Sequence, residues 1–526
     1  MQRYTILCYV VHFSLYFCTL YTYYYIHADT HAYIPRTTYT FIWYIVSDFP
    51  GFDILTRRIL AGFLFFSYLC RPMQQHIPTE LGTKPIGQLL WQYSLPAIIA
   101  MVASSVYNIV DSIFVGQGLG DAAISGMAVA TPFMNLSAAF GAMVGVGAST
   151  VISVRLGQGK YKEAQHILGN TISMNILLGI TFTIVCLPFL DNILYLFGAS
   201  NVTLPHARSY MTVILFGNVI SHSYFGLNAV LRSAGHPRSA MGCTFLAIII
   251  NCILDPLFIF VFRWGVEGAA WATIIAQAIA LCWQLRLFSR PAELLHLQRG
   301  IYQLRLDIVR QCLAIGLSPF LMNSCACLTV LICNNQLLQH GGDMAIGAYG
   351  IVNRIVFLFA TIVFGLVQGM QPIIGYNWGA RQNDRVFRVL RYGIIGATCI
   401  TTAAFLTGEL IPAPVIHIFG AGPELTEKAV RAFHIVVAAF PLVGAQMVIG
   451  NFFQSIGHAG KSIFLSLCRQ MLFLIPMLTL LPKWWGLDGV WMARPVSDSL
   501  SVITATGMLV YMVRKIKQSE THRTTQ

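Results

Sequence analysis

Apolar segments long enough to cross a bilayer recur along most of this chain of 526 residues. One of them is residues 94–116, SLPAIIAMVASSVYNIVDSIFVG. Backbone polar groups inside a bilayer must be satisfied within the protein, so spanning segments are helices or closed barrels. No run of short alternating strands typical of a barrel is visible. With 56% hydrophobic and 10% charged residues, against about 25% charged in soluble domains, the sequence predicts an all-α integral membrane protein.

We expect twelve transmembrane helices. They cover residues 88–116, 123–153, 167–190, 209–231, 240–262, 266–288, 308–338, 345–375, 388–412, 430–456, 462–482 and 486–513. Lys and Arg follow every second span, whereas the alternate loops 117–122 and 340–344 contain neither. The positive-inside rule then predicts that both termini are cytoplasmic. These loop positions also account for the net charge of +13, and nothing favours a nucleic-acid partner.

The chain repeats itself at a spacing of about 222 residues. Gly157 corresponds to Gly379, the segment 233–236 (SAGH) to 455–458 (SIGH), and the segment 264–268 (WGVEG) to 485–489 (WGLDG). Each half holds six spans, an even number, so the halves share one orientation. The repeat predicts two pseudo-symmetric six-helix lobes, related by an axis along the membrane normal.

The domain organisation follows from these features. We expect an atypical extension at residues 1–72, an N-lobe at 73–288, a linker at 289–307, a C-lobe at 308–513 and a cytoplasmic tail at 514–526. The extension has three readings: extra membrane segments, a signal-anchor, or translated upstream DNA, and we favour the last, with the native start at Met73. The linker is either an amphipathic surface helix, because its leucines recur at three- and four-residue steps, or a plain connection.

Two carboxylates lie within the first-half spans. Asp111 is in the first span with Tyr107 one turn before it, and Asp255 is in the fifth span with Asn251 on the same helix face. Pro256 frees a backbone carbonyl and permits a kink beside them. Intramembrane acids are costly and by default mark a functional site, although they can also serve only to hydrogen-bond helices. With Thr273 of the sixth span, these oxygen-bearing groups suit H⁺ or Na⁺, for which Asp111, Asn251 and Asp255 would be the ligands.

Such a pair can exchange a cation during a transport cycle, because desolvation and a neighbouring carboxyl group both favour the protonated form of an acid. The second half lacks the pair: Asp111 corresponds to Asn334 or Asn335, and Thr273 falls close to Arg494. Arg494 and Asp498 are four residues apart, so we expect them to form an intramembrane ion pair.

Polar residues of the second half are candidates for a substrate cavity, or alternatively for hydrogen bonds between packed helices. They are Asn334, Asn335, Gln336, Gln368, Gln371 and Arg354. For Arg354 the alternative is a side chain that reaches out to the membrane surface.

No enzyme motif is present. The 13 cysteines are single residues in apolar segments rather than ligand pairs. No Walker A, HExxH or GxSxG sequence occurs, so we expect neither an enzyme nor a cofactor beyond the coupling ion.

Residues 86–511 resemble the multidrug and toxic compound extrusion (MATE) family and, within it, the MepA-like branch. The resemblance is carried by 95–132 (LPAIIAMVASSVYNIVDSIFVGQGLGDAAISGMAVATP), by 251–277 (NCILDPLFIFVFRWGVEGAAWATIIAQ), and by the repeated SAGHP and SIGHAG elements. It implies twelve helices in two lobes and alternating-access export of organic cations by antiport with H⁺ or Na⁺.

The resemblance also implies residue roles and a setting. The family's first-lobe cation site falls on Tyr107, Asp111, Asn251, Asp255 and Thr273, whereas residues 334–336 (NNQ) lack the helix 7 acid of some members. We expect a monomer in the cytoplasmic (inner) membrane of a bacterium, with drugs and lipid as partners. The main alternative is a flippase for a lipid-linked precursor with the same fold.

Overall fold

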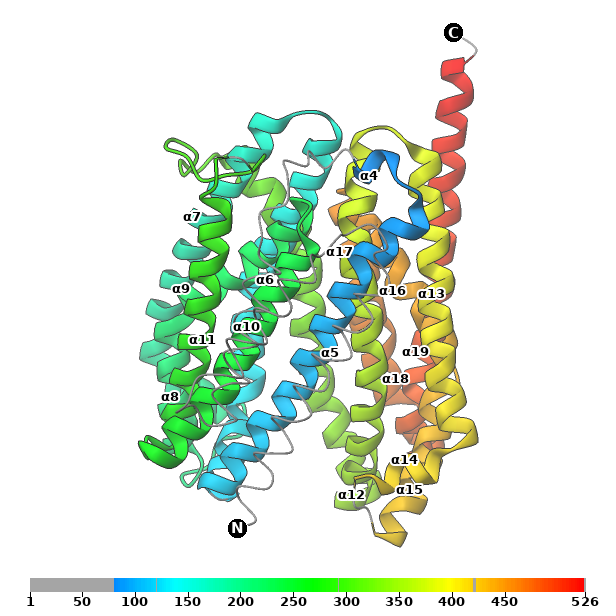
Figure 1. Cartoon of the computed structure of the whole chain (residues 1–526). Coiled ribbons are helices and arrows are strands. Elements are labelled where there is room, and N and C mark those ends of the chain that lie inside the picture. Colours follow the sequence, from blue (N-terminus) through cyan, green and yellow to red (C-terminus); the bar gives the residue numbers. More distant parts are fainter. Residues whose placement is uncertain (1–79, 120, 292, 420–421, 525–526) are drawn as a thin grey trace, which may run out of the picture. The chain divides into compact units, whose positions relative to one another are not determined.

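The structure is a computed structural model of the chain, and it describes residues 80–119, 121–291, 293–419 and 422–524 (Figure 1). Our interpretation of residues 1–72, and the proposed start at Met73, lie outside these residues. In the described ranges every regular element is a helix, as apolar spans in a bilayer require. The predicted all-α class is therefore confirmed.

The N-lobe begins with the short helix α4 (Glu80–Thr83). The helices that follow are α5 (Ile86–Leu119), α6 (Asp121–Gly157), α7 (Tyr161–Cys186), η1 (Leu187–Phe189), α8 (Leu190–Leu196), α9 (Leu204–Ser233), α10 (Pro237–Pro256), η2 (Leu257–Val261) and α11 (Gly265–Phe288).

The C-lobe begins with α12 (Leu306–Gly379), which bends at Gly342 and so supplies two spans. It continues with α13 (Asn383–Leu410), α14 (Pro412–His417), α15 (Pro423–Val437), α16 (Phe440–Ser455), α17 (Ala459–Leu467), η3 (Cys468–Leu474), α18 (Ile475–Leu480) and α19 (Pro482–Thr524).

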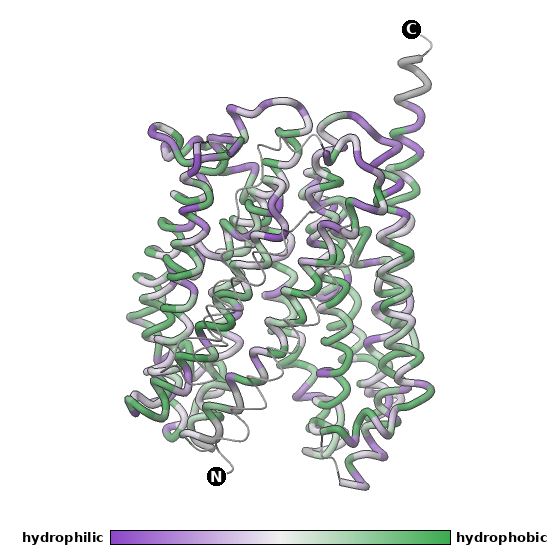
Figure 2. Tube along the Cα trace, viewed as in Figure 1, coloured by the Kyte–Doolittle hydropathy of each residue, from purple (hydrophilic) through white to green (hydrophobic). Residues whose placement is uncertain are grey.

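Eleven helices in the described ranges are long and apolar enough to cross a membrane, and there are up to twelve if one bent pair counts as a single span. The pair is α15 and α16, whose axes differ by 49°. Pro441 at the start of α16 contributes to the break, because proline has no N–H to donate to the preceding turn. Figure 2 shows apolar residues along the helices and polar residues gathered in the loops at one end. The chain is therefore a multi-pass membrane protein.

The repeat is visible in the backbone itself. Gly235 and Gly457 both have positive φ (96° and 78°), and so do Gly265 and Gly486 (64° and 52°). These are the corresponding glycines of the repeated sequence elements, and glycine adopts this region without a steric penalty. Equal turns at equal positions mean that the two lobes are built on the same plan.

The lobes pack together at the end that carries the basic loops after α6, α9, α11, α12 and α16, here called the basic end. Gln371 of α12 is 5% exposed there and donates to the Val146 carbonyl (3.2 Å) and the Thr150 hydroxyl (2.6 Å) of α6. Asn377 donates to the carbonyl of Leu81 in α4 (2.9 Å). Polar groups thus tie α6 and α4 to α12 where the backbones approach closely.

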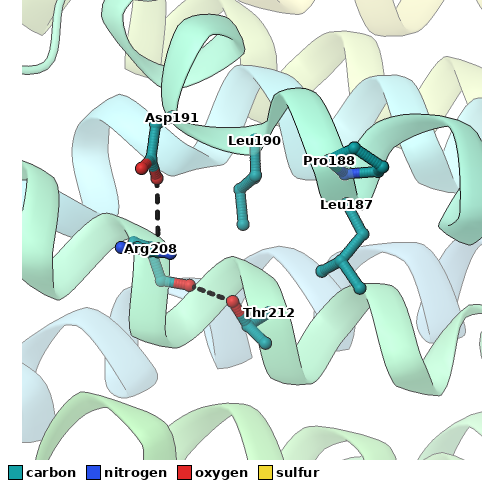
Figure 3. A pocket seen from close by; sticks show the side chains of 6 residues that line it. All are labelled: Leu187, Pro188, Leu190, Asp191, Arg208 and Thr212. Atoms are coloured by element: carbon teal, nitrogen blue, oxygen red, sulfur yellow. Dashed lines mark hydrogen bonds and ion pairs between the residues drawn. The ribbon is translucent and has the colours of Figure 1, made fainter.

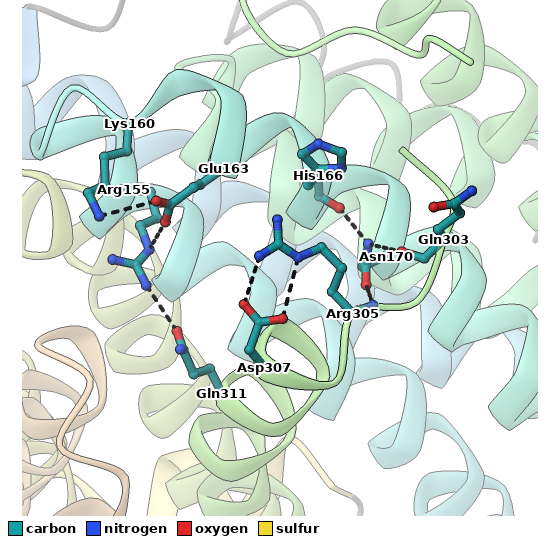
Figure 4. A network of polar contacts seen from close by, with 9 residues as sticks. All are labelled: Arg155, Lys160, Glu163, His166, Asn170, Gln303, Arg305, Asp307 and Gln311. Carbon is teal, nitrogen blue, oxygen red and sulfur yellow. Dashed lines mark hydrogen bonds and ion pairs between the residues drawn. The ribbon is translucent and has the colours of Figure 1, made fainter. Parts of the chain in front are cut away.

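The linker between the lobes contains turns but no helix in its described residues, 289–291 and 293–305. The predicted amphipathic helix is wrong, and the plain connection is correct. Its apolar residues nevertheless face the protein, since Leu295 and Ile301 are buried against the N-lobe core. Asn170 of α7 holds its end, donating to the carbonyls of Ile301 (3.2 Å) and Gln303 (3.0 Å) and accepting from the Arg305 N–H (2.8 Å) (Figure 4).

Candidate cation site

The structure brings the two intramembrane carboxylates of the N-lobe together. Asp111 comes from α5 and Asp255 from α10, and their carboxyl groups lie within hydrogen-bonding reach of each other. Asp255 is 0% exposed. One oxygen of each carboxyl group, Oδ1, is buried without a protein partner. A hydrogen bond between two carboxyl groups requires one proton, because an ionised carboxylate can only accept.

Asn251 joins the pair to its neutral neighbours. With the amide oriented so that each atom has a compatible partner, its nitrogen lies 2.7 Å from Asp255 Oδ2 and 2.5 Å from the Tyr107 hydroxyl. Its oxygen then accepts from the Thr273 backbone N–H at 2.9 Å and from the Thr273 hydroxyl at 3.2 Å. All five residues expected at a cation site therefore form one cluster between α5, α10 and α11.

The backbone next to Asp255 departs from regular α-helix. After Pro256 the chain continues as the π-helical segment η2, Leu257–Val261. Proline cannot donate to the carbonyl four residues earlier, and π-segments are frequent at functional sites. The predicted irregularity at Pro256 is thus confirmed, and it occurs one residue after the buried acid.

Tyr210 of α9 belongs to the same cluster, and sequence reasoning missed it. It is 4% exposed and lies close enough to Asp111 and Asp255 for electrostatic interaction with both. Its hydroxyl donates to Met134 Sδ at 3.4 Å. The sequence gives no signal for this role, because Tyr210 lies near the start of an apolar span without a polar neighbour at helical spacing.

The donor set fits a proton better than a sodium ion. Na⁺ needs several oxygen ligands, yet the Asn251 oxygen faces Thr273 and its nitrogen faces Asp255 and Tyr107. This leaves the carboxyl oxygens as the principal ligands for a metal ion. Among the described residues there is also no cluster of three His, Cys, Asp or Glu side chains that could hold a metal.

The residues expected to line a substrate cavity lie at several places on α12. Asn334, Asn335 and Arg354 are exposed and Gln336 is half-buried. Gln368 lies beside α5, where its amide donates to Met101 Sδ at 3.5 Å, and Gln371 lies in the contact between the lobes. Their role in substrate binding stays a prediction.

The expected ion pair between Arg494 and Asp498 is wrong. Asp498 accepts instead from Arg469 Nε at 2.8 Å, and that arginine belongs to the π-helical segment η3. Arg494 donates to the Tyr349 hydroxyl (3.1 Å) and to Asn353 Oδ1 (3.0 Å). Shared helical spacing permitted the pair, but a side chain from a neighbouring helix competes for the carboxylate.

A separate small pocket lies between η1, α8 and α9, lined by Leu187, Pro188, Leu190, Asp191, Arg208 and Thr212 (Figure 3). Its two charged groups, Asp191 and Arg208, pair with each other at 3.3 Å. The pocket therefore offers no unpaired charge and does not include the carboxylate cluster.

Comparison with known families decides the class. The MatE family model matches residues 96–257 and 315–480, one stretch in each lobe. The chain belongs to the MATE family. The matched stretches contain Tyr107, Asp111, Asn251 and Asp255 of the N-lobe cluster.

Relatives of this MATE protein agree with the resemblance to the MepA-like branch. The multidrug export protein MepA of Staphylococcus aureus (strain NCTC 8325 / PS 47) is 28% identical over 434 residues, which cover 82% of this chain and 94% of the relative. MepA of Staphylococcus haemolyticus (strain JCSC1435) is 28% identical over 433 residues, with the same coverage.

Solved MATE structures share the fold. The MATE multidrug transporter DinF-BH, solved in complex with a ligand, is 34% identical, with a TM-score of 0.77 over 84% of this chain and 98% of that chain. A MATE transporter in an outward-facing conformation is 22% identical, with a TM-score of 0.79 over 85% of this chain and 100% of that chain. The expected MATE-type fold is confirmed.

Proposed function

We propose that this MATE protein is a secondary active multidrug exporter, which expels amphipathic organic cations in exchange for inward H⁺. The observation that carries the proposal is the carboxyl pair Asp111–Asp255 inside the N-lobe, held within reach of a shared proton. Multidrug export is the printed role of MepA, and DinF-BH, a multidrug transporter, was solved with a small-molecule cation bound. A lipid flippase is not favoured, since the relatives are drug transporters.

The proposed cycle is alternating access. With both termini cytoplasmic, the basic end is the cytoplasmic end, and the packing of α6 against α12 there corresponds to an outward-facing state. Proton binding at the pair favours release of the drug to the outside, and by thermodynamic linkage the drug weakens proton binding by the same factor. The membrane field contributes about 2.3 kcal/mol per 100 mV for each charge moved.

Dye efflux from membrane vesicles, with pH and Na⁺ gradients applied separately, tests the proposal. Export should follow the pH gradient, and Asp111→Asn and Asp255→Asn should abolish it while protein levels are unchanged. Asp191→Asn is the matched control, because Asp191 lies in the same lobe in a solvent-accessible ion pair. Export driven by Na⁺ alone would replace H⁺ as the ion. Efflux that persists with all gradients collapsed, or wild-type rates in both site variants, would contradict the mechanism.

A further inference from the structure

The C-lobe carries a positive group at the place where the N-lobe carries its cation cluster. Trp264-Gly265 and Trp485-Gly486 are repeat partners with the same backbone turn. Counting equally from these glycines, Thr273 of the N-lobe cluster corresponds to Arg494. One lobe thus holds buried acids at this level, and the other holds a guanidinium group.

The charge of Arg494 is not neutralised by a bonded carboxylate. Its hydrogen-bond partners among the described residues, Tyr349 and Asn353, are both neutral. Asp498 is near enough to act on Arg494 electrostatically, but its carboxylate is bonded to Arg469. Ser497 fixes Arg469 from the other side by donating to its backbone carbonyl at 2.9 Å. Two arginines share one acid, which leaves one net positive charge.

Part of the Arg494 side chain is free to accept a ligand. Both hydrogen bonds leave from Nη1, whereas a guanidinium group has five N–H donors arranged as a fork. Arg494, Tyr349 and Asn353 are all half-buried, so each keeps accessible surface. Arg494 lies eight positions beyond the bend at Gly486, about 12 Å along the helix. A charge at that depth faces the protein interior rather than lipid.

We propose that Arg494, positioned by Tyr349 and Asn353, is an anion-accepting subsite that binds the carboxylate of zwitterionic substrates. A guanidinium fork matches a carboxylate in a bidentate arrangement. The cationic part of the same molecule would be handled as in the exporter proposed above, on which this inference rests. The subsite would extend the substrate range from organic cations to amphipathic zwitterions.

Two dyes that differ only at the carboxylate make the test sharp. Rhodamine 123 is a methyl ester with a single positive charge, and rhodamine 110 is the corresponding free acid. Arg494→Gln should lower rhodamine 110 efflux by about tenfold or more, as expected for losing a charge-assisted bidentate contact, and leave rhodamine 123 efflux within about twofold. Arg354→Gln, which removes an exposed arginine of α12, should change neither.

A second measurement avoids the variant altogether. In the wild-type protein, benzoate should displace bound rhodamine 110 and leave bound rhodamine 123 in place. Equal loss of both dyes in Arg494→Gln, no loss of either, or equal displacement by benzoate would overturn the subsite. The exporter itself is judged independently by gradient-driven rhodamine 123 efflux in the wild type, so the two proposals fail separately.

Discussion

Gly157 of α6 and Gly379 of α12 make the same contact from opposite lobes. A Cβ atom on Gly157 would lie 1.9 Å from the carbonyl oxygen of Tyr376, and one on Gly379 would lie 2.1 Å from the carbonyl oxygen of Val154. Gly157 and Gly379 are repeat partners, and so are Val154 and Tyr376. The lobes therefore meet at the basic end through a two-fold backbone contact that excludes any side chain.

Substitution of either glycine should prevent this end from closing. We expect Gly157→Val and Gly379→Val to reduce efflux at least tenfold, because backbone atoms cannot give way as a flexible side chain can. Cysteines introduced beside the contact should become more reactive toward a water-soluble maleimide in both variants. Gly87→Val is the control, since a Cβ at Gly87 meets nothing within 4 Å. Normal efflux with unchanged labelling would show that the contact is not required.

Asn251 is the residue that holds the carboxyl cluster together. Asn251→Leu leaves Asp255 Oδ2 and the Tyr107 hydroxyl without this partner, at a cost of about 1–3 kcal/mol for each buried polar group. We expect proton-driven efflux to fall by roughly tenfold or more. The control is Asn323→Leu, which removes an exposed amide bonded only to its own helix at Pro319. Equal effects of the two substitutions on pH-driven dye export would argue against a special role for Asn251.

The ion pair between Arg469 and Asp498 should behave as a coupled unit. Removing one partner of a buried pair costs about 3–5 kcal/mol, whereas replacing both by apolar residues is often neutral. Arg469→Met and Asp498→Leu should each lower the melting temperature in detergent, and the double variant should recover most of the loss. A double-mutant cycle of thermal unfolding measures this coupling. Additive losses would mean that the two side chains stabilise the protein separately.

The linker should detach from the N-lobe at low pH. Glu293 accepts from or pairs with His236 Nε2 at 2.9 Å, and this hydrogen bond holds the pKa of Glu293 below its usual 4.5. A carboxyl group with a lowered pKa stabilises the docked state above its ordinary pKa, and that stabilisation is lost as pH falls through the lowered value.

Hydrogen-exchange protection of the linker amides, corrected for intrinsic exchange rates, should therefore decrease between pH 6 and roughly pH 3. In Glu293→Gln the protection should be lower at pH 6 and should depend less on pH. Glu267→Gln, in a different loop, serves as the control. A wild-type profile in Glu293→Gln would assign the pH dependence to other groups.

The cation cluster was predictable because each signal was local or general. Asn251 and Asp255 share a helix face by spacing, and an acid inside an apolar span is conspicuous wherever it occurs. The fold was predictable from the spans and the repeat. Contacts between helices were not: the spacing of Arg494 and Asp498 indicated a pair, and nothing in the sequence shows that Arg469 reaches Asp498 first.

The linker failed for a different reason. Its leucines recur at helical steps, but such steps also occur where turns pack against a surface. Pro291 and Gly300, the latter with a φ of 93°, interrupt a helix in this short segment. Tyr210 shows the same limit from the other side, because only the packing of α9 brings it to the acids.

The docked linker fixes where the two lobes can turn. Asn170 grips the chain as far as the Arg305 N–H, and α12 begins at the next residue, Leu306. No slack separates the lobes, so this joint is the pivot of a lever. The nearby ends of α7 and α12 must stay together while the opposite ends swing, and lengthening the chain by a few residues at position 305 would loosen the stroke without touching any residue that binds proton or drug.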